Sequence, residues 1–112
     1  DVDVVSGIYR QRKDEQILEI YGEHGSNLAW SDISDNKLFK IGGCGFGCVL
    51  VKREVFEGVG QPAFEYHVAL NHKDTVSEDW DFCAKARDKG FEVWADTDVV
   101  CGHIGATVFR VN

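Results

Sequence analysis

One long helical pattern stands among several short strand-like runs, and this mixture limits the chain to the α/β or α+β class. The helical window covers residues 78–89. Ser77 precedes it as a candidate N-cap, and Gly90 follows it where glycine commonly ends a helix. One face of this predicted helix carries residues at helical spacing: Asp79, Phe82, Cys83 and Ala86.

Short runs rich in β-branched and aromatic residues predict the strands, at 2–9, 17–21, 48–51, 91–95 and 99–101. A shorter helix is expected over 52–57, ended by Gly58, and residues 26–40 and 65–74 are expected to be irregular. There is no internal repeat, low-complexity segment or linker. The sequence therefore predicts one domain over 1–112, an α/β fold with a mixed sheet and flanking helices.

The charge balance and the apolar pattern exclude some classes of function. With 19 acidic and 12 basic residues the formal charge is −7, which disfavours nucleic-acid binding and suits a divalent cation. No apolar run approaches the roughly 18 residues of a membrane span, and no signal-peptide pattern is present. The 4 cysteines are sparse for a disulfide scaffold, so reduced thiols and a cytoplasmic location are expected.

The chain contains no methionine, even at position 1, and it opens directly into an apolar alternation. The natural N-terminus of a protein usually has an initiator methionine and a few residues before the first strand or helix. We therefore expect the sequence to be a fragment of a longer protein.

Three carboxylates, on Glu78, Asp79 and Asp81, crowd the predicted helix start beside Trp80. One interpretation is electrostatic, because acids in a first turn each stabilise a helix by about 0.3–1 kcal/mol. The other is catalytic, because a carboxylate fixed on a helix start is well placed to act as a general base. Both interpretations remain open on spacing alone.

His103 lies between glycines just after a predicted strand, where an imidazole is accessible to a metal. A lone histidine is more often an ordinary surface or capping residue. A zinc site built from Cys44, Cys48, Cys101 and His103 is a further alternative, although the cysteine spacing gives no reason for the four side chains to converge.

The glycine-rich segment at 42–47 precedes a strand rather than a helix, which argues against a phosphate-binding loop. It is expected to form a tight turn. Its bare glycine backbone would allow a sugar to approach closely, with Gly45 and Phe46 as the candidate substrate-binding residues. The D-x-D triplets at 1–3 and 96–98 are interpreted as chance matches in an acidic chain.

Four segments, in order, resemble the second half of glycosyltransferases with the GT-A fold, especially family 2. Residues 2–9 resemble the strand after that family's metal-binding segment, and residues 45–56 its glycine-led strand and short helix. Residues 77–83 resemble the Glu-Asp motif at the start of the acceptor-side helix. Residues 91–103 resemble the final strands, which end at a histidine.

This resemblance implies transfer of a sugar from a nucleotide-sugar donor to an acceptor hydroxyl. Asp79 would be the general base, Glu78 would support it or contact the acceptor, and Trp80 would stack on a sugar ring. His103 would complete a Mn²⁺ or Mg²⁺ site that neutralises the leaving diphosphate.

The nucleotide-binding half of that family is missing from the sequence. The isolated chain is therefore expected to have little or no transferase activity. One alternative is a non-catalytic sugar-binding or self-associating module, in which a homodimer covers the exposed sheet edge. A small zinc-stabilised interaction domain is the third hypothesis.

Overall fold

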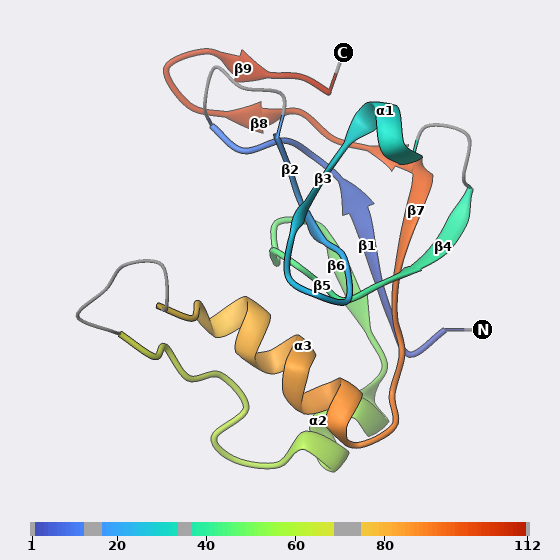
Figure 1. The fold of residues 1–112 in the computed structure, drawn as a ribbon, viewed down its shortest axis with the longest axis vertical. Coiled ribbons are helices and arrows are strands. Elements are labelled where there is room, and N and C mark those ends of the chain that lie inside the picture. The colour runs from blue at the N-terminus through green and yellow to red at the C-terminus, as the bar shows by residue number, and fades with distance from the viewer. Residues whose placement is uncertain (1, 13–16, 34–36, 69–74, 112) are drawn as a thin grey trace.

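The computed structural model describes most of the chain, namely residues 2–12, 17–33, 37–68 and 75–111 (Figure 1). Its main sheet has four strands in the order β4-β7-β1-β6. These are β4 (Leu38–Ile41), β7 (Val93–Val100), β1 (Val4–Ile8) and β6 (Val49–Val51). β1 runs parallel to β7, whereas β6 pairs antiparallel with β1 and β4 antiparallel with β7. The predicted α/β class with a mixed sheet is confirmed.

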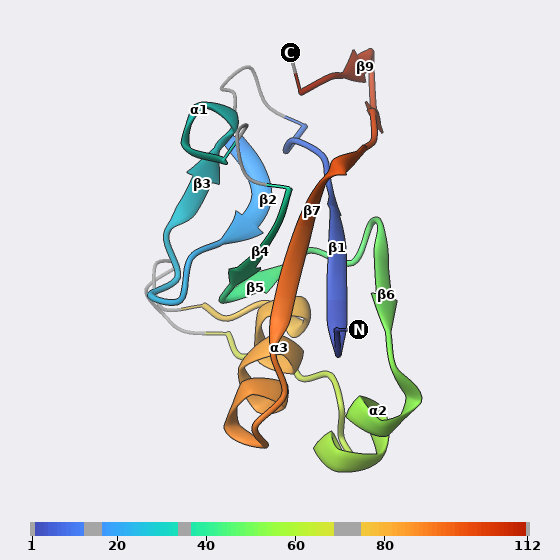
Figure 2. The same ribbon diagram turned by 90° about the vertical axis from the view of Figure 1, so that its right-hand side faces the viewer.

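A smaller antiparallel sheet has the order β3-β2-β5, with β3 at Asn27–Ala29, β2 at Ile17–Tyr21 and β5 at Gly43–Cys44. β8 (His103–Ile104) and β9 (Val108–Phe109) form a short hairpin near the described C-terminal end. In Figures 1 and 2 this hairpin lies at the end of the molecule opposite α2 and α3.

Three helices complete the described part of the fold: α1 (Trp30–Ile33), α2 (Arg53–Val59) and α3 (Glu78–Asp88). α3 packs against α2 and β5. None of the described helices is both long enough and apolar enough to cross a membrane.

The core joins the main sheet to α3. Val4, Ile8 and Val93 of the sheet are fully buried, as is Phe82 of α3. The Phe82 ring is surrounded by three further aromatic rings with centroids 4.8–5.3 Å away: Phe46, Phe56 and Phe64. Through this aromatic cluster, the glycine-rich segment, α2 and the chain after α2 all pack against α3.

Several predicted elements are confirmed. The strand at 17–21 is β2, and the helix at 78–89 is α3, which ends one residue earlier. Gly90 has φ +89°, a conformation that glycine adopts readily after a helix. Ser77 has the extended backbone of an N-cap, but its side chain makes no capping hydrogen bond.

Other elements differ from the prediction. The runs at 91–95 and 99–101 belong largely to one strand, β7. It pairs with β4 as far as Asp96 and with β1 from Val93 to Ala95, and it meets β1 again at Val100 after a register shift. Residues 26–40 are not irregular: they contain β3, α1 and the start of β4. Gly58 does not end the short helix but lies within α2, where an added Cβ would stand 2.6 Å from the ring of Phe91. Residues 69–74 of the predicted loop lie outside the described residues.

Candidate functional site

A cavity of about 750 Å³ opens where β1 and β7 end and α3 begins. In open α/β sheets, ligands bind beyond the carboxyl ends of the parallel strands, and β1 and β7 are the parallel pair here. The lining comes from five separate segments of the chain: Tyr9, Gln11, Arg12, Glu19, Phe46, Gly47, Cys48, Asp79, Cys101, Gly102 and His103.

Asp79 lines this cavity from the first turn of α3. One of its carboxylate oxygens, Oδ2, accepts a hydrogen bond of 3.2 Å from the Phe46 amide. Burial raises the pKa of Asp79 above its ordinary value; the Phe46 hydrogen bond opposes this rise and the charge of Glu78 adds to it. A half-buried carboxylate with a fixed orientation and a raised pKa is suited to accepting a proton from a ligand hydroxyl.

Tyr9 lies at the carboxyl end of β1, opposite the glycine-rich segment. Its hydroxyl accepts a 2.8 Å hydrogen bond from the Gly47 amide. Burial raises the pKa of Tyr9 to about 12, against the lowering effect of the Gly47 hydrogen bond and with a further rise from the charge of Glu19. The phenol therefore stays protonated at neutral pH and presents a hydrogen-bond donor to the cavity.

His103 lies at the start of β8, and its ring contacts the ring of Tyr9 edge-on at a centroid distance of 5.3 Å. Its Nδ1 is 2.8 Å from the carbonyl oxygen of Arg10. A carbonyl only accepts hydrogen bonds, so Nδ1 must carry the proton and Nε2 has the free lone pair when the ring is neutral. That tautomer is suited to binding a metal or accepting a proton.

Glu19 on β2 and Arg12 after β1 add one charge of each sign to the lining. Together with Tyr9 they are site residues that the sequence analysis missed. The only sequence signal for Tyr9 was its place at the end of a predicted strand. Glu19 is a polar residue between apolar ones in a predicted strand, which is an ordinary pattern. The sequence could not indicate its role, because its neighbours in the cavity are distant in the chain.

Three of the predicted site residues do not line this cavity: Gly45, Glu78 and Trp80. Glu78 is exposed at the start of α3. The Trp80 ring packs on the backbone of Gly43, meets the Tyr21 ring edge-on at 5.7 Å, and is covered by the Arg87 guanidinium at 5.3 Å. The structure thus places Trp80 in the contact between α3 and β5.

The other predicted sugar-binding residues lie at or behind the cavity wall. Phe46 lines the cavity and also belongs to the aromatic cluster around Phe82. Gly45 lies behind the wall, where an added Cβ would stand 2.5 Å from the Tyr9 hydroxyl and 3.1 Å from a carboxylate oxygen of Glu19. Gly45 therefore allows these two polar groups to approach the backbone closely.

All four cysteines are free thiols. Cys44 and Cys83 are buried side by side, and the pKa of Cys44 is raised by its hydrogen bond with Cys83 and by burial. Cys48 and Cys101 line the cavity instead. Among the residues that the structure describes, the zinc set of Cys44, Cys48, Cys101 and His103 does not converge into a metal-binding group.

The D-x-D triplets have structural roles where they are described. Asp3 accepts a 3.0 Å hydrogen bond from the Glu92 amide, which ties the start of β1 to the chain before β7. Asp96 accepts one of 2.9 Å from the Asp98 amide within its own triplet. Asp1 lies outside the described residues.

Comparison with known proteins gives a fold but no family. No family model matches the sequence, and no curated protein matches it. The chain is similar to the crystal structure of A197 from STIV, with a TM-score of 0.62 at 20% sequence identity. The match covers 100% of this chain and 53% of that one, so the present chain spans about half the length of its structural neighbour.

These results overturn the assignment to family 2 of the GT-A glycosyltransferases. No family model supports it, and the structure that the chain resembles, A197 from STIV, is not named as a glycosyltransferase. The four resembling segments are short patterns of glycines, acids and apolar residues, which unrelated α/β chains share because strand ends and helix starts favour them. What the structural likeness shows is a shared fold.

Proposed function

We propose that the cavity beside Asp79 binds a sugar or another polyhydroxylated ligand, and that Asp79 takes the proton from a ligand hydroxyl during transfer of a sugar from a nucleotide-sugar donor. The observation that carries this proposal is the position of Asp79: its carboxylate is fixed on a helix start and lines a cavity of about 750 Å³. A base must reach its hydroxyl at hydrogen-bond distance, and a helix start holds a side chain more rigidly than a loop does.

The rest of the lining supports a ligand with many hydroxyls. Tyr9 supplies a donor, Glu19 and Asp79 supply acceptors, and the Phe46 ring offers an apolar face. Arg12 would pair with a phosphate of the donor, since a guanidinium binds phosphate oxygens through two parallel hydrogen bonds. This mixture of a few polar groups with an aromatic surface is typical of small-molecule sites.

Mn²⁺ or Mg²⁺ at His103 stays a prediction from the sequence. The described residues of this cavity do not gather three ligand side chains around His103, and magnesium requires a near-octahedral set of oxygens. We therefore assign no step of the proposed reaction to a metal.

The test is a binding experiment that monitors the backbone amide shifts of the chain by NMR. The ligands are a panel of neutral monosaccharides and disaccharides together with UDP- and GDP-sugars. We expect shift changes to concentrate at Tyr9, Gly47 and His103. Asp79→Asn should weaken binding about tenfold or more, since it removes a charged acceptor worth about 1.5–3 kcal/mol. Asp88→Asn is the matched control, because Asp88 is exposed at the other end of the same helix.

The proposal is contradicted if Asp79→Asn and Asp88→Asn weaken binding equally. It is also contradicted if the amide shift changes are confined to another surface of the chain. The purified chain is also expected to have little or no sugar transfer by itself, because the sequence shows no segment like the nucleotide-binding half of a glycosyltransferase. Turnover of a sugar nucleotide by this chain alone would contradict that expectation.

One observation favours a second candidate function, self-association. β6 is an edge strand of the main sheet, and its Leu50 side chain is 75% exposed beside an apolar cavity of about 420 Å³. An unpaired edge with an apolar side chain is a surface that a second copy covers readily. If the chain forms a dimer through β6, Leu50→Lys should convert it to a monomer in analytical ultracentrifugation, whereas Leu38→Lys on β4 should not.

A further inference from the structure

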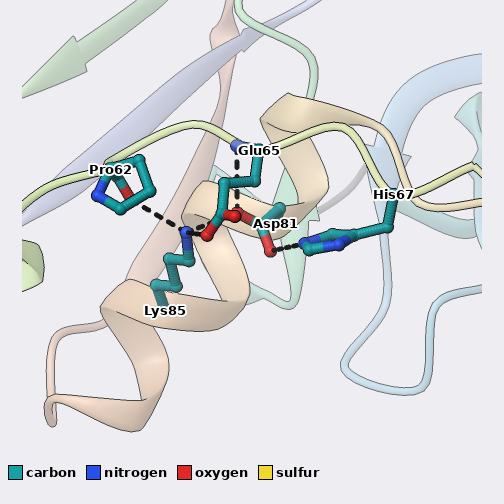
Figure 3. A network of polar contacts seen from close by, with 5 residues as sticks. All are labelled: Pro62, Glu65, His67, Asp81 and Lys85. Carbon is teal, nitrogen blue, oxygen red and sulfur yellow. Dashed lines mark hydrogen bonds and ion pairs between the residues drawn. The ribbon is translucent and has the colours of Figure 1, made fainter.

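A second group of titratable side chains lies outside the cavity, between α3 and the segment after α2 (Figure 3). Glu65 and His67 come from that segment and Asp81 comes from α3. Their ligand-type atoms all lie within 4.8 Å of one another. Lys85, one helical turn after Asp81, reaches into the same group.

The contacts within this group are short and divided between the two oxygens of Asp81. Oδ1 lies 3.0 Å from Nε2 of His67. Oδ2 lies 2.9 Å from Nζ of Lys85 and accepts a 3.2 Å hydrogen bond from the Glu65 amide. The Lys85 ammonium also lies 2.7 Å from Oε1 of Glu65, so it bridges two carboxylates as a cation.

Asp81 is only 9% exposed, which is unusual for a carboxylate. Burial raises its pKa, but hydrogen bonds from Lys85 and His67 outweigh this and lower the pKa overall. The group therefore presents a buried carboxylate beside a histidine and a second, partly exposed carboxylate.

The backbone that carries these side chains is held by other contacts. The Phe64 ring, adjacent to Glu65, stacks on Phe82 of α3 at 4.8 Å with an interplanar angle of 15°. The backbones of His67 and Val76 exchange two hydrogen bonds of 2.9 and 2.8 Å. The backbone that carries the ligands is thus already positioned, which lowers the cost of ordering the site around a metal ion.

We propose that Glu65, His67 and Asp81 form a binding site for a transition-metal dication of the Zn²⁺ type, with the Lys85 ammonium as the resident cation that such a metal displaces. Zinc bonds of about 2.0–2.1 Å in tetrahedral geometry place neighbouring ligand atoms about 3.3 Å apart. The 3.0 Å separation of His67 Nε2 and Asp81 Oδ1 is close to that value. Glu65 closes the site when its carboxylate turns from Lys85 toward the metal.

The chemistry of the donors selects the metal. Imidazole and carboxylate are both zinc ligands, whereas magnesium and calcium prefer six or more oxygens. Three protein ligands leave a fourth position for water. In the metal-free protein Nε2 of His67 faces Oδ1 of Asp81 at 3.0 Å and donates its proton to that oxygen. To bind a metal through Nε2, the neutral ring takes the tautomer whose proton is on Nδ1.

The test is a titration of the purified, metal-free chain with Co²⁺ followed by visible absorption, and with Zn²⁺ followed by calorimetry. We expect one equivalent to bind and to give the absorption of tetrahedral Co²⁺ with nitrogen and oxygen ligands. His67→Ala should abolish this binding, whereas His24→Ala, at an exposed histidine outside the group, should leave it unchanged.

Lys85→Met separates a metal site from a simple ion-pair network. If Lys85 competes with the metal, its removal should tighten Zn²⁺ binding about fivefold, since partly exposed ion pairs of this kind are weak. Unchanged or weaker binding in Lys85→Met would overturn the proposal that the metal displaces Lys85. Failure to bind Co²⁺, equal loss in His24→Ala, or thiolate-to-cobalt charge-transfer absorption would each overturn the site itself. Circular dichroism of the metal-free variants checks that all of them fold.

Discussion

Gly43 lies against the face of Trp80, at the contact between β5 and α3. An added Cβ at Gly43 would stand 2.5 and 2.7 Å from two carbons of the Trp80 ring and 3.3 Å from Cβ of Cys83. Carbon atoms in contact are normally about 3.5–4.0 Å apart, so Gly43→Ala forces a displacement of about 1 Å. The change therefore tests whether the Trp80 ring really packs on this strand.

The size of the effect follows from two opposing contributions. Overpacking a well-packed contact costs about 1–3 kcal/mol. Replacing glycine by alanine restricts the unfolded chain and recovers about 0.4–1 kcal/mol. We expect Gly43→Ala to lower the free energy of unfolding by about 1–2 kcal/mol, a large part of the roughly 5–15 kcal/mol that stabilises a typical domain.

The assay is urea unfolding of four proteins: wild type, Gly43→Ala, Trp80→Leu and the double variant. Leucine at position 80 removes the ring that the new methyl meets. Gly43→Ala should then cost nothing or stabilise slightly in the Trp80→Leu background, which corresponds to a coupling energy of about 1–2 kcal/mol.

Gly60→Ala is the matched control. Gly60 has φ +74°, and an added Cβ there meets no atom within 4 Å. Its substitution costs about 1–3 kcal/mol through backbone strain alone, and this cost should be the same in both backgrounds. If the cost of Gly43→Ala is also unchanged by Trp80→Leu, the proposed contact between Gly43 and Trp80 is refuted.

Three further predictions concern the alkaline pH range, the aromatic cluster and the end of α3. The pKa of Tyr9 is about 12 when folded and about 10 when unfolded, so the stability that its protonated form contributes is present below pH 10 and is lost as the pH rises toward 12. Urea midpoints at pH 9, 10 and 11 should therefore fall less steeply in Tyr9→Phe than in wild type, and equal slopes would contradict this. A double-mutant cycle of Phe64→Leu and Phe82→Leu should give a coupling energy of about 0.5–1.5 kcal/mol, and additive costs would argue against the stacked pair. Gly90→Ala should cost about 1–2 kcal/mol in thermal or urea unfolding because φ is +89°, and a neutral result would mean that α3 ends differently.

The candidate site was only partly predictable from the sequence. Asp79 stood out because acids at a helix start are visible in the local pattern, and His103 because it follows a strand. Tyr9 and Glu19 could not be found in this way, since they reach the cavity through pairing of β1 and β2 with distant segments. The group around Asp81 was missed for the same reason: its carboxylate appeared to be one more acid of the first turn.

The sequence by itself determined the local elements whose periodicity is strong, such as β2 and α3 with Gly90 at its end. It also determined the mixed α/β class, because one long helical period among short strand runs has few other solutions. Only the tertiary structure decided that the two C-terminal runs join in β7, that Gly58 lies inside α2, and that Trp80 packs on Gly43. The physical reason is that these outcomes depend on contacts between residues far apart in the chain, whereas propensity and periodicity describe only neighbours.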